Sequence, residues 1–168
     1  KANGDWLNNK YVQWLSVPPS GGDESLCIGA CYYEAIHKKK NNKNKIYPMV
    51  NPYLGEEPDL KNDDFYYRLK GTGFKKTDFK ELPNFTNKKI AKLLARDEII
   101  ARCVGRAEFG ARALGNRSIL ANPKNYANIE KINKLIKNRD FWMPFTPSIN
   151  AEHSKKLILN KKRVSSPY

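Results

Sequence analysis

Residues 105–119 read Gly-Arg-Ala-Glu-Phe-Gly-Ala-Arg-Ala-Leu-Gly-Asn-Arg-Ser-Ile, a span that combines three arginines, three glycines and one glutamate with few bulky apolar side chains. A packed core does not need that mixture. Arginine guanidinium groups stay charged and match the oxygens of a phosphate or another planar anion, while glycines let backbone N–H groups come close to it. We call this stretch the glycine–arginine segment, and it predicts a site for a small anionic substrate.

An apolar run lies immediately before this segment, Ile-Ile-Ala-Arg-Cys-Val at 99–104, and predicts a largely buried strand. Such a strand delivers Gly105 and Arg106 at its carboxyl end, where ligands of open α/β sheets tend to bind. Helices are expected before and after in the chain, over 87–97 with its first residue as the cap, and over 126–138. The segment is therefore expected to begin at the end of a strand.

A second basic segment, Lys-Asn-Arg-Asp-Phe-Trp-Met-Pro-Phe-Thr-Pro-Ser-Ile at 137–149, repeats the pattern with aromatic and proline residues. We expect the two segments to face one site. Two interpretations of Lys137 stay open: a lysine on a solvated helix face, which is the commoner case, or a cation that reaches the anion. Trp142 and Phe145 are expected to anchor the core, with base stacking a distant second.

Composition limits the class of protein. The chain has 168 residues, enough for one ordinary domain or for pieces of two. No apolar run approaches the roughly 20 residues that cross a bilayer, and the first residues lack the apolar stretch of a signal peptide. We therefore expect a cytoplasmic protein with no membrane partner. The cysteines Cys27, Cys31 and Cys103 lack C-x-x-C spacing, which predicts buried free thiols and neither disulfides nor a zinc site.

A net charge of +14 raises the question of a nucleic-acid partner. Much of the charge lies in the lysine- and asparagine-rich run at 38–45 and in Lys161, Lys162 and Arg163. These look like solvated loops, and no aromatic-glycine RNA signature accompanies them. Nucleic acid thus stays open as a partner but is not favoured.

Near the N-terminus the pattern predicts a strand, a turn and a helix. Residues 12–17 read as a short strand, a proline- and glycine-rich turn follows, and a helix begins with Asp23 or Ser25 as its cap. A carboxylate at such a turn can also serve a phosphate or metal site, because helix N-terminal N–H groups converge there. From the residues alone, capping is the more common role of Asp23.

The two basic segments together resemble those of the carbamoyltransferase family whose members modify nodulation factors and antibiotics. In that family a segment of the form Gly-Arg-x-Glu-Phe-Gly-Pro-Arg-Ala-Leu-Gly-Asn-Arg-Ser-Ile-Leu is followed by Arg-Asp-x-x-x-Pro-Phe-x-Pro. The first match runs from Gly105 to Leu120 and departs at Ala111, where the family often has proline. Proline would restrain φ at that position, so the departure loosens the backbone there and changes little else.

The resemblance extends to the N-terminal part. A family segment similar to Pro-x-x-Gly-Asp-x-x-x-x-x-Gly-Ala has its counterpart in Pro19, Gly22, Asp23, Gly29 and Ala30. In the family this aspartate is a metal ligand in an actin-like (ASKHA) domain, whose other ligands come from a His-x-x-x-His pair. Neither histidine of this chain matches that pair, so Asp23 would bind a divalent metal only together with a missing N-terminal domain.

The resemblance therefore implies a division of the chain. Residues 1–40 would be the end of the actin-like N-terminal domain, 41–60 a linker, and 61–168 a YrdC-like C-terminal domain. The fold class it implies is α/β, a twisted mixed sheet with helices, preceded by the strand-turn-helix remnant of the actin-like domain. Ser-Pro-Tyr at 166–168 looks like a family segment that normally continues, so we expect a truncated enzyme. A truncated sheet has an edge that can pair with a second copy of the chain, so a homo-oligomer stays open as a prediction.

The function implied by the resemblance is ATP-dependent O-carbamoyl transfer. Carbamoyl phosphate and ATP, with magnesium, would form carbamoyl-adenylate, and the carbamoyl group would pass to a hydroxyl-bearing small molecule or sugar. Negative charge on the transferred group calls for preorganised donors. The catalytic roles are expected for Arg106, Arg112, Arg117 and Arg139. Substrate-binding roles are expected for Gly105, Glu108, Gly110, Gly115, Asn116, Ser118 and Lys137.

Several of these roles keep alternatives. Glu108 would coordinate magnesium or, slightly favoured, orient an arginine through a fork-to-fork pair. Asn116 and Ser118 would bond the ligand or serve turns and caps. For the chain as a whole, two other classes stay open beside the carbamoyltransferase: a basic YrdC-like RNA-binding module without transfer activity, and a non-catalytic interaction fragment.

Overall fold

The computed structural model describes residues 2–18, 20–38, 45–58, 69–78, 82, 85–160, 162 and 164. Expectations on Pro19, most of the lysine-rich run at 38–45, Lys161, Arg163 and 166–168 therefore lie outside the described residues. The chain divides into two compact units. Unit 1 comprises Lys1–Gly55, Glu108–Gly115 and Thr146–Tyr168, and unit 2 comprises Glu56–Ala107 and Asn116–Phe145.

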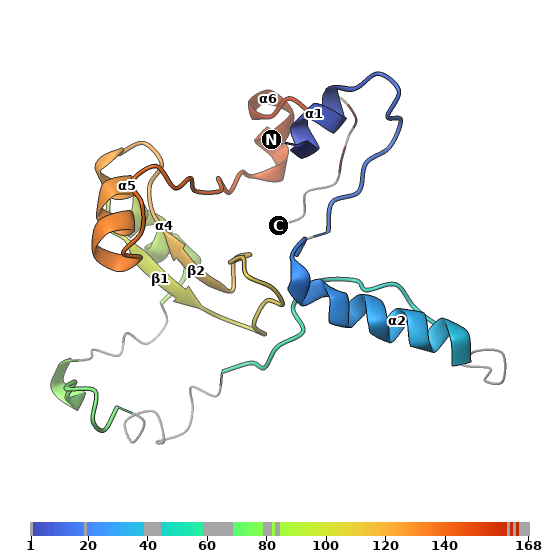
Figure 1. Cartoon of the computed structure of the whole chain (residues 1–168). Helices are drawn as coiled ribbons and strands as arrows, with labels where there is room; N and C mark the ends of the chain where they lie inside the picture. The colour runs from blue at the N-terminus through green and yellow to red at the C-terminus, as the bar shows by residue number, and fades with distance from the viewer. Residues whose placement is uncertain are drawn as a thin grey trace. The chain divides into compact units, whose positions relative to one another are not determined.

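Unit 2 is built on a pair of antiparallel strands, β1 (Ile100–Cys103) and β2 (Arg117–Leu120), which lie side by side in Figure 1. The register places Ile100 opposite Leu120 and Cys103 opposite Arg117. One further bond, from Val104 N to Asn116 O at 3.0 Å, continues the ladder beyond the strands. The two ends of the glycine–arginine segment are thus held together by backbone pairing.

In the described part of unit 2, helical elements come before and after the strands in the sequence. A 3-10 turn, η3, spans Lys76–Asp78, and helix α4 spans Asn87–Ala95. The N-cap of α4 is Thr86, whose side chain accepts a hydrogen bond from Lys89 N, so the expected cap at Asn87 is wrong by one residue. Because a cap residue takes an extended backbone, Thr86, with φ −96° and ψ 160°, fits that role.

Helix α5 (Ala127–Lys131) continues directly into a π-helical turn, η4 (Ile132–Ile136). Together they form the helix expected over 126–138, although its last part is wider than an α-helix. Ile132 is the buried hydrophobic residue of the described part of the chain, and the neighbouring Asn133 is only 1% exposed. After η4 the chain turns at Asn138, which has a left-handed φ of 45°.

Among its described residues, unit 1 has four helical elements: α1 (Ala2–Asn8), the 3-10 turn η1 (Asp23–Ser25), α2 (Leu26–Lys38) and α6 (Ala151–Leu157). The helix expected after the glycine turn is confirmed by η1 and α2. Its expected caps are not: Gly22 is the N-cap, no side chain caps it, and Ser25 Oγ donates back to Gly22 O at 2.8 Å. Lys162, expected in a solvated loop, donates from Nζ to Trp6 O and Asn9 O at the end of α1.

The α/β composition expected for the chain is confirmed, with a smaller sheet than the resemblance implied. Within the described residues the sheet is the single antiparallel pair β1–β2, and no larger twisted mixed sheet is seen there. The strand expected at 12–17 is wrong, because those residues have no strand structure. A strand is stabilised by a hydrogen-bonded neighbour, and no described strand pairs with this one.

Burial differs from the sequence expectation at the cysteines, the aromatics and β1. All three cysteines are free but exposed, since α2 carries no buried residue and the residues of β1 alternate between half-buried and exposed. Strand β1 is thus half-buried and not largely buried. Trp142 and Phe145, expected as core anchors, are 64% and 40% exposed. No helix in the described part of the chain is long and apolar enough to cross a membrane.

The left-handed turn at Asn138 yields a stability prediction. Replacing Asn138 with valine should destabilise the fold by roughly 1–2 kcal/mol, because a β-branched residue tolerates positive φ poorly, whereas Asn138→Gly should leave stability unchanged or slightly higher. Urea unfolding measures both variants, with Lys131→Val on α5 as the control for β-branching in a helix. Equal losses in Asn138→Gly and Asn138→Val would contradict a backbone origin of the effect.

Candidate anion-binding site

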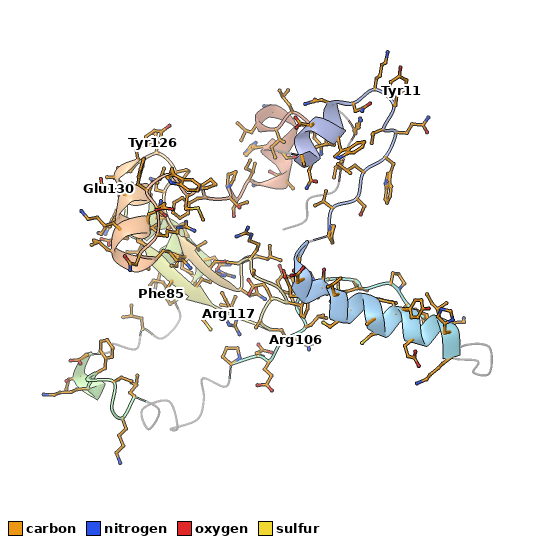
Figure 2. The ribbon with its side chains drawn as sticks, in the orientation of Figure 1. Tyr11, Phe85, Arg106, Arg117, Tyr126 and Glu130 are labelled. Carbon is orange, nitrogen blue, oxygen red and sulfur yellow. The ribbon has the colours of Figure 1, made fainter. Side chains whose placement is uncertain are left out.

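The backbone that begins the glycine–arginine segment is held by the side chain of Arg117. Its Nη1 donates to Val104 O at 2.8 Å and to Asn116 O at 3.1 Å. Its Nη2 donates to Gly105 O at 3.0 Å and to Glu56 O at 3.3 Å. The guanidinium thus donates four hydrogen bonds to carbonyl oxygens of unit 2. Figure 2 labels Arg117 and Arg106 at this end of the strand pair.

Asn116 holds the same turn from its other side. Its Nδ2 donates to Arg106 O at 2.8 Å, and Ala107 N donates to Glu56 O at 3.0 Å. Gly105 has a φ of +53°, and a Cβ there would lie 3.3 Å from Asn116 Nδ2. The left-handed φ favours glycine at this position, and a Cβ there would require the Asn116 amide to shift by a few tenths of an ångström. The result is a fixed turn on which the Arg106 residue is exposed.

The middle of the segment, Glu108–Gly115, belongs to unit 1 and is held by the residues predicted as a linker. Phe109 N donates to the carbonyl of the fully buried Pro52 at 2.7 Å, and Tyr53 Oη donates to Leu114 O at 2.9 Å. Within the segment, Leu114 N donates to Glu108 Oε1 at 2.8 Å. One oxygen of the Glu108 carboxylate thus accepts a hydrogen bond from the backbone of its own loop.

Glu24, in η1 just before α2, is the partner of this loop. Ser20, only 6% exposed, donates from Oγ to Glu24 Oε1, and the Glu24 carboxylate also accepts the N–H of Ala111. The hydrogen bond from Ser20, followed by bonds from backbone N–H groups, holds the pKa of the Glu24 carboxyl below its ordinary value of 4.5. A Cβ on Gly110 would lie 2.5 Å from Ser20 Oγ, so glycine is needed for this approach.

The second basic segment is organised by Asn133. Asn133 Oδ1 accepts from Arg139 Nε at 2.6 Å, while Nδ2 donates to Phe141 O at 3.1 Å and Met143 O at 3.3 Å. The Arg139 guanidinium also lies over the Phe145 ring, 4.7 Å from its centroid. Beside it is a shallow, open hollow of about 480 Å³, lined by Asn138, Arg139, Asp140 and Met143.

The predicted site residues are distributed over three groups. Gly105, Arg106, Asn116 and Arg117 come together on the turn of unit 2, and Ser118 follows them on β2 opposite Arg102. The loop of unit 1 carries Glu108, Gly110, Arg112 and Gly115. Arg139 lies in the Asn133 network, and Lys137 is exposed at the end of η4. That both segments face one site stays a prediction.

Metal ligands are also part of the expectation. Among the described residues, no group of three or more His, Cys, Asp or Glu side chains could hold a metal ion. Asp23 is exposed, so a metal role for it depends on ligands from elsewhere and stays a prediction.

Sequence reasoning missed the residues that hold these loops. Glu56 and Pro52 act through their carbonyl oxygens, which any residue type supplies, so no sequence signal marks them. Neither the contact of Glu24 with the Ala111 loop nor the role of Asn133 was predicted. Asn133 had one available signal, because it is a polar residue between Ile132 and Leu135 on the predicted helix.

The fold and these loops define the chain as an α/β protein with an arginine-rich segment between β1 and β2. Residues 91–168 match the family model described as the carbamoyltransferase C-terminus. The chain belongs to the carbamoyltransferase family, whose members are transferases, as the two basic segments indicated.

Named relatives agree with this assignment. The nodulation protein NolNO of Sinorhizobium fredii is 43% identical over 156 residues, which are 93% of this chain and 22% of that protein. The nodulation protein NolO of Bradyrhizobium diazoefficiens is 30% identical, over 93% of this chain and 28% of that protein. The 3'-hydroxymethylcephem-O-carbamoyltransferase of Streptomyces clavuligerus is 35% identical, over 41% of this chain and 13% of that protein. The chain thus spans about a quarter of the length of the curated relatives it matches over most of its own.

The Glu24 contact predicts a pH dependence within unit 1. Because the folded-state pKa lies below the ordinary 4.5, the contact contributes stability above pH 4.5 and loses it as pH falls through the folded value. Hydrogen exchange of the Ala111 amide, corrected for its intrinsic rate, should accelerate in that acid range. Glu24→Gln should remove most of this pH dependence, whereas Glu34→Gln, at the exposed ion pair with Lys38, should not. An unchanged pH profile in Glu24→Gln would contradict the assignment.

The Arg117 network predicts that charge alone cannot replace this arginine. Arg117→Lys keeps the charge, but a single ammonium nitrogen cannot reach all four carbonyl oxygens. Arg117→Lys and Arg117→Met should therefore both lower the free energy of unfolding by roughly 1.5–3 kcal/mol. Urea unfolding measures this, with Arg102→Lys on β1 as the control, expected to change stability by less than about 0.5 kcal/mol. Wild-type stability in Arg117→Lys would show that the carbonyl bonds do not hold the turn.

Proposed function

We propose that the chain is part of an ATP-dependent O-carbamoyltransferase. It would bind carbamoyl phosphate and ATP, take part in forming carbamoyl-adenylate, and thereby supply the carbamoyl group for a hydroxyl acceptor. The observation that carries the proposal is the turn at Gly105–Arg106, which Asn116 and Arg117 hold while the Arg106 residue remains exposed. Membership of the carbamoyltransferase family supports the nature of the transferred group.

The electrostatics of the loops favour anionic substrates. Carbamoyl phosphate and ATP both carry phosphate charge, which permanently charged guanidinium groups stabilise without a proton transfer. Arg112 is exposed, and no acceptor for its guanidinium is found among the described residues. We therefore assign phosphate or carbamoyl oxygens to Arg106 and Arg112. Arg117 would contribute charge and shape to the same turn.

The hollow at 138–143 fits the carbamoyl group itself. A carbamoyl group offers an acceptor oxygen and two N–H donors. Arg139 can donate to the oxygen, and the exposed Asp140 carboxylate can accept from an N–H, since both line the hollow. This pairing supports a donor that carries an amide in addition to phosphate.

ATP and magnesium are expected to enter together. The described residues contain no acidic cluster for a metal held by protein alone, and one Glu108 oxygen already accepts from Leu114 N. Magnesium usually keeps several waters and binds through substrate phosphates, so ATP would bring most of its ligands. When bound, the metal would neutralise phosphate charge; the residues of this chain would bind and orient the phosphates.

The rest of the expected enzyme is also part of the proposal. A YrdC-like C-terminal domain and the end of an actin-like domain would account for the division at 1–40, 41–60 and 61–168. The Streptomyces relative is named for carbamoylation of a hydroxymethyl group, which supports a hydroxyl acceptor here. A divalent metal at Asp23 would need ligands from beyond this chain.

Substitution of the two exposed arginines tests the proposal. Arg106→Ala and Arg112→Ala should each weaken carbamoyl phosphate binding by about tenfold to a hundredfold, because a hydrogen bond to a charged group contributes about 1.5–3 kcal/mol. Calorimetry measures the affinity, and Arg96→Ala at the C-cap of α4 is the control for loss of one exposed arginine. Unchanged carbamoyl phosphate binding in both variants would contradict the proposed anion site.

The same preparations decide against the RNA-binding alternative. An RNA-binding module would bind RNA with an affinity that falls steeply with salt and would ignore carbamoyl phosphate. The carbamoyltransferase should instead release pyrophosphate from ATP only when carbamoyl phosphate is present. Pyrophosphate release that does not depend on carbamoyl phosphate would contradict the proposed donor.

A further inference from the structure

We propose that Asn133 is a positioning residue that fixes the direction of the Arg139 guanidinium, so that only the two Nη groups of Arg139 are offered to an anion in the hollow at 138–143. The identity of the anion rests on the proposed function. The role of Asn133 rests only on the geometry of η4 and the turn that follows it.

The polar atoms of the Asn133 side chain are fully used, and their orientation is unambiguous. Arg139 Nε can only donate, so the atom 2.6 Å away must be Oδ1 of Asn133. The amide nitrogen then points to the carbonyls of Phe141 and Met143, at 3.1 and 3.3 Å. The backbone adds a further bond, from Arg139 N to Asn133 O at 3.0 Å. One side chain thus shapes the turn and directs the arginine.

Burial makes this arrangement rigid. Asn133 is 1% exposed, so water cannot replace its partners, and each unpaired group would carry a desolvation penalty. The Phe145 ring restricts the guanidinium from another direction, 4.7 Å from the Arg139 Cζ. Arg139 therefore loses little side-chain freedom when a ligand binds.

The consequence for the ligand is geometric. An arginine can present a two-donor fork through Nε and one Nη, or through both Nη groups. Because Nε is taken by Asn133, the Nε fork is excluded. Within the described part of the chain no acceptor is bonded to Nη1 or Nη2, and Arg139 lines the hollow. The site therefore suits two oxygens of one phosphate group, or the single oxygen of a carbamoyl group, approached end-on.

A double-mutant cycle tests the positioning role in the complete protein. Calorimetry with carbamoyl phosphate and with inorganic phosphate compares wild type, Asn133→Leu, Arg139→Ala and the double variant, and urea unfolding follows stability separately. Asn133→Leu should weaken binding about tenfold in the wild-type background but less than about twofold in Arg139→Ala, because its effect passes through Arg139. The same factor in both backgrounds would overturn the proposal.

A conservative variant separates positioning from folding. Asn133→Asp keeps an acceptor for Arg139 Nε while losing the two N–H donors, so it should lose stability yet keep phosphate affinity within about threefold of wild type. An Asn133→Asp protein that folds but binds as poorly as Arg139→Ala would overturn the proposal, and this test stands if Asn133→Leu fails to fold.

Ligand-free crystal structures of the Asn133 variants keep this inference distinct from the proposed function. The guanidinium of Arg139 should leave the hollow in Asn133→Leu and stay in Asn133→Asp. If it stays in both, the positioning role is wrong whatever the protein binds. If wild type binds neither phosphate nor carbamoyl phosphate, the proposed function fails, and the crystal structures alone decide the role of Asn133.

Discussion

The turn between β1 and β2 depends on one side chain that bonds to four backbone carbonyls. Arg117 joins the carbonyls of Val104, Gly105 and Asn116 with that of Glu56, far earlier in the chain. Two short strands have few ladder bonds of their own, so an arginine with several N–H groups can supply what the sheet does not. The exposed Arg106 residue acquires a defined backbone from this bonding.

The second segment uses the same physical device with a neutral residue. Asn133 binds two carbonyls of the following turn and directs Arg139, as Asn116 and Arg117 hold the turn at Gly105. In both places a polar side chain donates hydrogen bonds to several backbone carbonyl oxygens of a turn. The loops are thus held by hydrogen bonds more than by apolar burial, and Ile132 is the buried hydrophobic residue in the described ranges.

How far the sequence predicts this arrangement depends on the kind of information each feature needs. Local patterns predict the helix after Gly22, the helix over 87–97 and the strand before Gly105, and the structure contains all three. The resemblance of the two basic segments predicts the family, which the family model confirms. The strand at 12–17 fails because strand formation needs a partner that a local pattern cannot supply. The holding roles of Pro52 and Glu56 escape prediction because their carbonyl oxygens carry no signature of residue type, and the exposed cysteines show that composition does not determine burial.

Residue type does not show which bonds each arginine makes. Sequence reasoning expects catalytic roles for Arg106, Arg112, Arg117 and Arg139, because each has the same charged fork. The structure distinguishes them by the hydrogen bonds that each guanidinium already makes. Arg117 donates four hydrogen bonds to carbonyl oxygens, and Arg139 donates from Nε to Asn133 Oδ1. Arg112 has no acceptor among the described residues. A guanidinium has only five N–H groups, so every bond to the protein subtracts from those left for a ligand. The same residue type therefore has different amounts of hydrogen-bonding capacity left at different positions, which charge and sequence alone do not reveal.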